Sequence, residues 1–357
     1  MLSIITANAS RRSNMELLRI IAMMLVVIVH MCGAALGLPA PKGDIASITS
    51  SDWWKLSVES ISIIGVNIFV LISGYFGINT RWQTFWRFSL QCLFYSVGIY
   101  LVGWLIGIWQ LDWNVILRSS HIYTESYYWF VPAYFGLLII APLLNAAIRQ
   151  LSQHQYLLLL IAAAIVTIYG GWWCRLPFSD RGYSTYNFAF LYLLARYIAI
   201  YIPSHSTPSL RLRLNYITAY LLFTVGIFVT SLYIDNAFHY NSPLVIGAAL
   251  SLTLLFTTFS FQSVVINLIA ASSFSIYLIH MHPLLWIRLK NAVRAAASAY
   301  DTPAFALWCV AVILIMLIAC PLIDKIITIL IRPLSDILTA TSTRLTNLIT
   351  RHLPRKQ

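Results

Sequence analysis

Long apolar stretches separated by short polar segments make up most of the chain. A helix needs about 20 mostly apolar residues to cross a bilayer, and about ten stretches of that length are present. They predict an all-α integral membrane protein whose roughly ten transmembrane helices form a single bundle. The predicted spans lie near residues 15–36, 56–77, 84–108, 128–148, 156–173, 184–203, 214–234, 242–261, 264–286 and 303–330.

Composition agrees with this pattern, because 60% of the residues are hydrophobic and only 10% are charged. Such a chain has too little polar surface to stay dispersed in water, so the bilayer is its expected partner. We see no linker, low-complexity tract or internal repeat. One ten-helix membrane domain is therefore expected over 15–332, preceded by a cytoplasmic segment, 1–14, and followed by a basic cytoplasmic tail, 333–357.

The distribution of Lys and Arg predicts the orientation. Cytoplasmic loops retain these residues, and the side that carries both termini has more of them. The loops on the opposite side also hold Lys and Arg, but acidic residues offset their charge. Glu59 is counted among these acidic loop residues. We predict that both termini face the cytoplasm in a bacterial inner membrane. The net charge of +12 is mostly this topology signal, so no nucleic-acid partner is expected, and a homo-oligomer stays open.

Three ionisable residues lie inside the first predicted helix: Glu16, Arg19 and His30. A charged group there costs about 2.5–3.5 kcal/mol, which makes each one a functional candidate. Eleven residues separate Arg19 from His30, about three helical turns or roughly 16 Å, so all three side chains share one face. One interpretation is structural, an ion pair plus a histidine bonded to a neighbouring helix. The other is a water-filled cleft with a cation at its cytoplasmic end and a titratable imidazole inside.

Such an imidazole suits acyl transfer from a thioester to a hydroxyl. It either removes the hydroxyl proton as a general base or is itself acylated and passes the group on. The same residue types also serve proton coupling, so the alternative function is a multi-spanning transporter or flippase for glycan intermediates or acyl groups.

Four segments resemble the acyltransferase 3 family of bacterial membrane O-acyltransferases. Glu16-Leu-Leu-Arg19, followed by ten residues and His30, is similar to the family's opening signature. Three later segments look like its second-helix segment, its Trp-Phe helix and its late Ser-x-Ser-hydrophobic-Tyr-Leu-x-His element: 67–76, 128–135 and 273–280.

The resemblance implies a ten-helix core that transfers an acyl group, usually acetyl from acetyl-CoA, to extracytoplasmic carbohydrate. The chain is most similar to the stand-alone kind that modifies O-antigen, enterobacterial common antigen or capsule. It implies catalytic roles for His30, Glu16 and Arg19, with Arg19 also near the acyl-CoA. The matching segments make His280, Tyr277 and Trp129 candidates for binding the glycan.

One departure concerns the loop after the second predicted helix. Many relatives have Arg-x-x-Arg there, whereas this chain has Arg81 and Arg87. On one continuous helix these two side chains diverge by about 120° and could not hold one phosphate together, so donor binding requires either a bend or contact with different phosphates of coenzyme A. We keep both as donor-binding candidates, with the alternative that they only set topology.

No metal site is expected. The five cysteines form no C-x-x-C motif, and His280 and His282, two positions apart, point about 200° apart on a helix.

Overall fold

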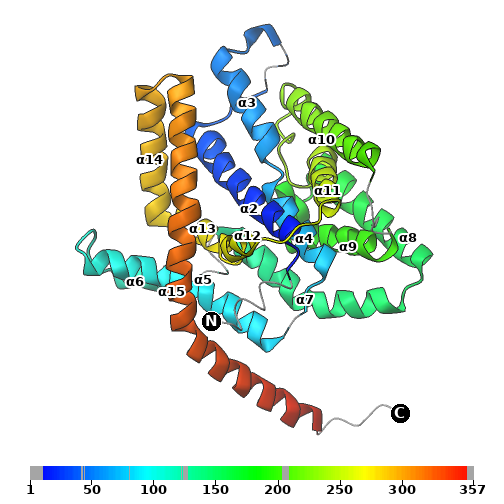
Figure 1. The fold of residues 1–357 in the computed structure, drawn as a ribbon, viewed down its shortest axis with the longest axis vertical. Helices are drawn as coiled ribbons and strands as arrows, with labels where there is room; N and C mark the ends of the chain where they lie inside the picture. Colours follow the sequence, from blue (N-terminus) through cyan, green and yellow to red (C-terminus); the bar gives the residue numbers. More distant parts are fainter. Residues whose placement is uncertain are drawn as a thin grey trace.

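The structure is a computed structural model that describes residues 11–41, 43, 45–79, 81–121, 123, 128–202 and 209–351. Every regular element within these residues is a helix, which confirms the all-α class (Figure 1). The elements are α2 (Ser13–Ile28), η1 (Val29–Ala34), η2 (Ile45–Ser47), α3 (Ser50–Ser62), α4 (Gly65–Phe76), α5 (Trp82–Leu105), α6 (Trp113–Ser120), α7 (Phe130–Gln150), α8 (Gln153–Ala164), η4 (Ile165–Trp173), η5 (Pro177–Gly182), α9 (Thr185–Tyr201), α10 (Leu210–Ser231), α11 (Pro243–Thr257), α12 (Val264–Ala270), α13 (Ser273–His280), α14 (Pro283–Ala299) and α15 (Thr302–Arg351).

Seven helices among the described residues are long and apolar enough to cross a membrane, and the count becomes eight if one bent pair forms a single span. Each of the seven overlaps a predicted span. Two other predicted spans correspond to shorter helices, α9 with 17 residues and α11 with 15. The chain is therefore a multi-pass membrane protein, and the predicted number of ten remains a prediction.

The predicted continuous span 264–286 is wrong. The segment Val264–His280 meets the helix Pro283–Ala299 at an angle of 83°. Pro283 opens α14 at its first turn, where a missing N–H costs nothing, but a proline there prevents a helix from running through from the preceding segment. The bend leaves His280 buried at the last residue of α13.

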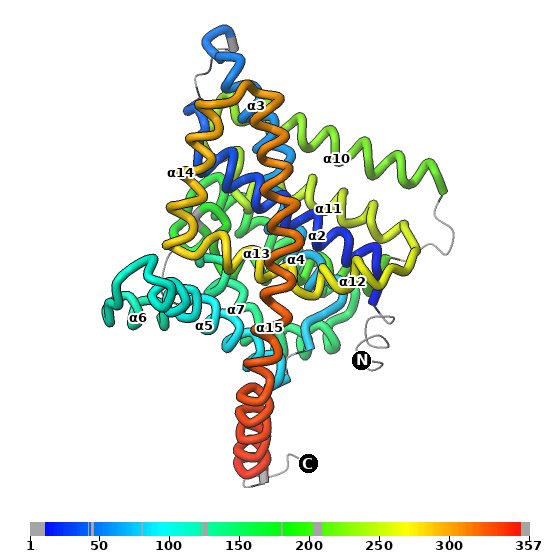
Figure 2. Tube along the Cα trace, turned by 60° about the vertical axis from the view of Figure 1, so that its left-hand side comes forward, coloured from blue at the N-terminus to red at the C-terminus, as the bar shows by residue number. Residues whose placement is uncertain are grey.

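The last helix is longer than the predicted span 303–330. α15 continues through the predicted start of the tail at 333 as far as Arg351. Its end lies against the start of α5, where the Trp82 and Trp86 indoles donate hydrogen bonds to Thr346 and Ser342. The first ten residues of the predicted N-terminal segment, and 352–357 of the tail, lie outside the described residues. Figures 1 and 2 show α15 along one side of the bundle, projecting beyond it at what we call the lower end.

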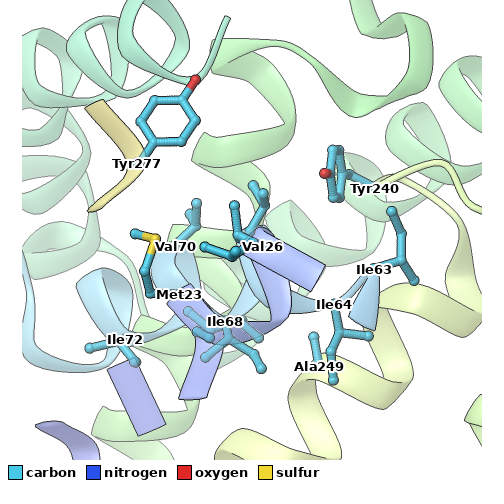
Figure 3. Close-up of a cluster of buried hydrophobic side chains, with 14 of the residues drawn as sticks. Met23, Val26, Ile63, Ile64, Ile68, Val70, Ile72, Tyr240, Ala249 and Tyr277 are labelled. Carbon is cyan, nitrogen blue, oxygen red and sulfur yellow. The ribbon is translucent and has the colours of Figure 1, made fainter. Parts of the chain in front are cut away.

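The opposite, upper end is where α3 begins and α14 passes into α15 (Figure 1). Between the two ends, α2 runs through the centre of the bundle, in contact with α4, α11, α12 and α13. α4 packs close to α2 because Gly65 has no side chain, since an added Cβ would lie 2.6 Å from the Ala22 carbonyl oxygen. Figure 3 shows the resulting apolar core, with Tyr277 and Tyr240 on opposite sides of Val26. This arrangement surrounds the middle of α2 with residues from distant parts of the chain.

Candidate active site

His30 lies on a π-helical segment. α2 widens into η1 at Val29, one residue before the histidine. Such segments are rare and often occur at functional sites, because the wider turn redirects the side chains that follow it. The segment leads upward from the centre of the bundle, so it joins the apolar core to the upper end.

The two histidines that the sequence placed 250 residues apart are in contact. The His30 Nδ1 atom lies 3.2 Å from His280 Nε2, and the ring centroids are 5.1 Å apart. His280 Nδ1 lies 2.6 Å from the Ile276 carbonyl oxygen. A carbonyl only accepts, so the network assigns the hydrogen of uncharged His280 to Nδ1 and leaves Nε2 to accept from His30 Nδ1–H. His30 Nε2 then carries a lone pair, and besides His280 the His30 ring is hydrogen-bonded to the backbone of Val26, one helical turn earlier.

A small, mostly apolar cavity of about 30 Å³ adjoins this histidine. Three of the predicted site residues line it: His30, Tyr277 and Trp129. Trp129 stacks on Tyr183 at 4.0 Å and on Tyr240 at 5.3 Å, so it forms part of an aromatic wall. The other lining residues are Met23, Val26, Val66, Phe69, Phe130, Tyr240 and Phe274. The fold thus assembles one chamber from segments that resemble four separate family motifs.

Glu16 and Arg19 form the ion pair that their spacing predicts. Arg19 Nη1 lies 2.7 Å from Glu16 Oε2, and Arg11 Nη1 lies 3.6 Å from the same oxygen. The Glu16 side chain is only 8% exposed and that of Arg19 is 26% exposed. Neither residue lines the cavity at His30. The Glu16–Arg19 ion pair and His30 therefore lie on the same helix, but the cavity at His30 does not extend to the ion pair.

Arg81 and Arg87 differ in their surroundings. Arg81 precedes the first residue of α5 and lines a groove at the lower end with a volume of about 700 Å³. Arg87 is exposed and does not line that groove. The rest of the groove consists of Trp82, Gln83, Phe85, Ile139, Pro142, Thr339 and Thr343. Because Arg81 precedes α5 in an extended conformation, the helical divergence expected from the spacing of the two arginines does not apply to them.

Sequence reasoning missed Glu59, which it counted as a loop residue. The structure places Glu59 inside α3, 4% exposed, within the candidate span Ser50–Phe76. Its Oε2 atom has no hydrogen-bond partner among the described residues. Its carboxylate lies so close to Gly33 on η1 that a Cβ at Gly33 would be 2.9 Å from the carboxyl carbon. The capping box of Thr49 and Asp52 was the available signal, because it starts a helix that continues through Glu59.

A second buried carboxylate, Asp324, has a different environment. Its Oδ1 atom accepts hydrogen bonds from Gln91 Nε2 at 2.8 Å and from the Tyr95 hydroxyl at 3.0 Å. These contacts join α15 to α5 in the membrane interior. Because its partners satisfy it, Asp324 fits a structural role that holds the last helix in place.

Comparison with known proteins supplies the family. A model of the acyltransferase domain matches residues 12–324, which include Glu16, Arg19, His30, Arg81, Arg87 and His280. No curated protein and no solved structure matches the chain. The match spans most of the chain, and it agrees with the helical membrane fold and with the histidine in the first helix. The chain belongs to the acyltransferase 3 family and is a membrane acyltransferase.

Proposed function

We propose that this protein is an O-acyltransferase of a bacterial inner membrane, with both termini in the cytoplasm. It moves an acetyl group from cytoplasmic acetyl-CoA to a hydroxyl of an extracytoplasmic surface glycan, such as O-antigen, enterobacterial common antigen or capsule. The observation that carries this proposal is the position of His30, which lines a cavity and whose Nδ1 contacts His280.

The reaction uses His30 as a general base. The glycan hydroxyl gives its proton to His30 Nε2 while its oxygen attacks the thioester carbonyl carbon. The C–S bond then breaks, and the leaving thiolate of coenzyme A takes the proton back. His280 stabilises the positive charge on His30 during this exchange by accepting from Nδ1–H, in the manner of the residue that orients a catalytic histidine in a triad.

We favour a general-base role for His30 over a mechanism in which His30 is itself acylated. An acyl group on His30 Nε2 would have to be formed and hydrolysed or transferred within the same narrow cavity. In the observed network Nε2 is available, and His280 increases its ability to hold a proton. His280 therefore orients the reacting imidazole, and the role of glycan contact falls to Tyr277 and Trp129, which line the cavity.

The donor approaches from the lower end. Coenzyme A carries several phosphate groups, which arginine guanidinium groups bind well. Arg81 borders the large groove there, and Arg19 lies roughly three helical turns below His30. Glu16 holds Arg19 in place through the 2.7 Å ion pair. Arg87 is exposed on α5 and lies outside the groove, so its attraction for the phosphates of coenzyme A is weaker than that of Arg81.

The test uses protein purified in detergent with radiolabelled acetyl-CoA and unacylated surface glycan. The proposal predicts label on the glycan even though no sealed compartment exists. A transporter of glycan intermediates or acyl groups would instead require sealed vesicles and would leave the glycan unlabelled in detergent. Absence of label on the glycan with folded, monodisperse protein would overturn the proposed function.

A further inference from the structure

A second groove lies at the upper end, away from Arg81. It has a volume of about 380 Å³ and lies between the start of α3 and the connection from α14 to α15. Its lining combines aromatic rings with hydrogen-bonding groups, and includes Trp54, Lys55, Tyr300, Thr302, Ser51 and Phe305. None of these residues takes part in the reaction described above.

The chemistry of this lining suits a sugar unit. A pyranose ring presents an apolar C–H face, which packs on an aromatic ring, and a rim of hydroxyls, which need donors and acceptors. Trp54 and Tyr300 supply the rings, while Lys55, Ser51 and Thr302 supply the polar groups. Tyr300 is 50% exposed, and Lys55 makes no ion pair with any residue that the structure describes. A lipid chain would find polar groups that it cannot satisfy.

The groove is held by contacts between its two walls. The ring centroids of Trp54 on α3 and Phe305 on α15 are 6.0 Å apart, and Phe305 stacks on Trp308 at 6.3 Å. These contacts fix the indole before any ligand binds. Such preorganisation lowers the entropy that binding would otherwise cost.

The groove also has a direct structural link to the catalytic histidine. Leu36, which lines it, follows His30 by six residues on the same helix, a distance of about 9 Å along the axis. Glu59, one helical turn below Lys55, contacts Gly33 between them. The His30 segment thus lies between a groove at the upper end and the arginine-bordered groove at the lower end.

We infer that the upper groove is a remote acceptor subsite, which binds a non-reacting sugar unit of the glycan through Trp54, Tyr300 and Lys55. This inference rests on the proposed function for the identity of the acceptor. Binding at such a subsite holds the chain while a neighbouring hydroxyl reaches His30. It therefore contributes to the affinity for the glycan more than to the rate of the bound complex.

The experiment measures acetyl transfer with surface polysaccharide extracted from a strain in which this gene is deleted. For Trp54→Ala and Tyr300→Ala, KM for the polysaccharide should rise roughly five- to tenfold, with kcat changed by less than about twofold. Trp53→Ala is the matched control, because Trp53 neighbours Trp54 but stacks on Phe228 of α10 and does not line the groove. Lys55→Gln and Tyr300→Phe repeat the test with smaller changes in case an alanine variant fails to fold.

Direct binding separates this inference from the proposed function. The change in tryptophan fluorescence of detergent-purified protein is titrated with the same polysaccharide, without acetyl-CoA. Weaker binding by Trp54→Ala and normal binding by Trp53→Ala support the subsite even if no acetyl transfer occurs. Acetyl transfer by the wild type with unchanged polysaccharide KM and binding in Trp54→Ala, Tyr300→Ala and Lys55→Gln would overturn the subsite and leave the proposed function intact.

Discussion

The Glu16–Arg19 ion pair and the His30 imidazole, both on the first helix, differ in the partners that they have. At the lower end, Glu16 and Arg19 neutralise one another within a single turn, with Arg11 close by. Further up, His30 contacts His280 on another helix, lines a cavity and, in the tautomer assigned above, keeps a lone pair on Nε2. A carboxylate already held by two arginines is suited to positioning a charge. A nitrogen with an unused lone pair is suited to accepting a proton, so chemistry is expected at the second group.

The strongest test of this difference removes His30. His30→Ala should lower kcat by about 100-fold or more, as expected when a general base is lost. The measurement is acetyl transfer at equal protein abundance in the membrane. His154→Ala is the matched control, because His154 is exposed at the start of α8 and should retain full activity. Equal rates for His30→Ala and the wild type would contradict the claim that the chemistry takes place at His30 and not at the Glu16–Arg19 pair.

Changing His280 tests whether His30 and His280 act together. His280→Ala should lower kcat by roughly ten- to a hundredfold, with little change in KM for acetyl-CoA or for the glycan. Residues that orient a metal-bound imidazole in other proteins have effects of this size. His280→Gln offers an amide oxygen to His30 Nδ1–H and should recover part of the loss. A purely structural role for His280 predicts reduced protein abundance with normal activity in the surviving protein.

The close contact between Gly33 and Glu59 offers a test of the segment that carries His30. Gly33→Ala would force the added Cβ against the Glu59 carboxylate, so it should shift η1, reduce kcat by roughly tenfold and destabilise the protein by about 1–3 kcal/mol. Combining it with Glu59→Ala should restore both properties, because the second change removes the obstructing atoms.

The control for that pair is Gly98→Ala on α5, since a Cβ at Gly98 meets no other atom within 4 Å. This variant should match the wild type in thermal unfolding and in acetyl transfer. An additive loss in the Gly33→Ala, Glu59→Ala double variant, without recovery, would mean that the contact does not position His30.

The smallest effect is expected at the lower end. Arg81→Ala should raise KM for acetyl-CoA by up to about fivefold, because one exposed charge contributes about 0.2–1 kcal/mol. Arg87→Ala should have a weaker effect, since Arg87 lies outside the groove that Arg81 lines. Raising the salt concentration should diminish both differences. Arg211→Ala, exposed at the start of α10, serves as the control, and a change as large as that of Arg81→Ala would reduce the role of Arg81 to net charge alone.

Local features could be predicted from the sequence. The ion pair of Glu16 and Arg19 follows from their spacing of three residues, and the long helices follow from the length of their apolar stretches. The bend before Pro283 was missed although proline is a recognised break, because apolar residues continue on both sides of it. Glu59 was misassigned because its helix starts at a polar segment that resembles a loop.

Features that depend on distant residues could not be derived from spacing. The resemblance to the family selected His280, but only the packing of α13 against α2 brings its Nε2 atom to His30 and so suggests a role for it. The π-helical form of η1 and the closeness of the Glu59 carboxylate to Gly33 likewise follow from no local sequence pattern. The upper groove combines α3 with the connection between α14 and α15, nearly 250 residues later in the chain.

The most direct measurement is intact-protein mass spectrometry after rapid quenching of purified protein that has been mixed with acetyl-CoA, with and without the glycan. If His30 removes a proton and is never acylated, the protein gains no acetyl group in either mixture while the glycan becomes acetylated. A protein species heavier by one acetyl group, formed without glycan, dependent on His30 and lost when glycan is added, would contradict the account.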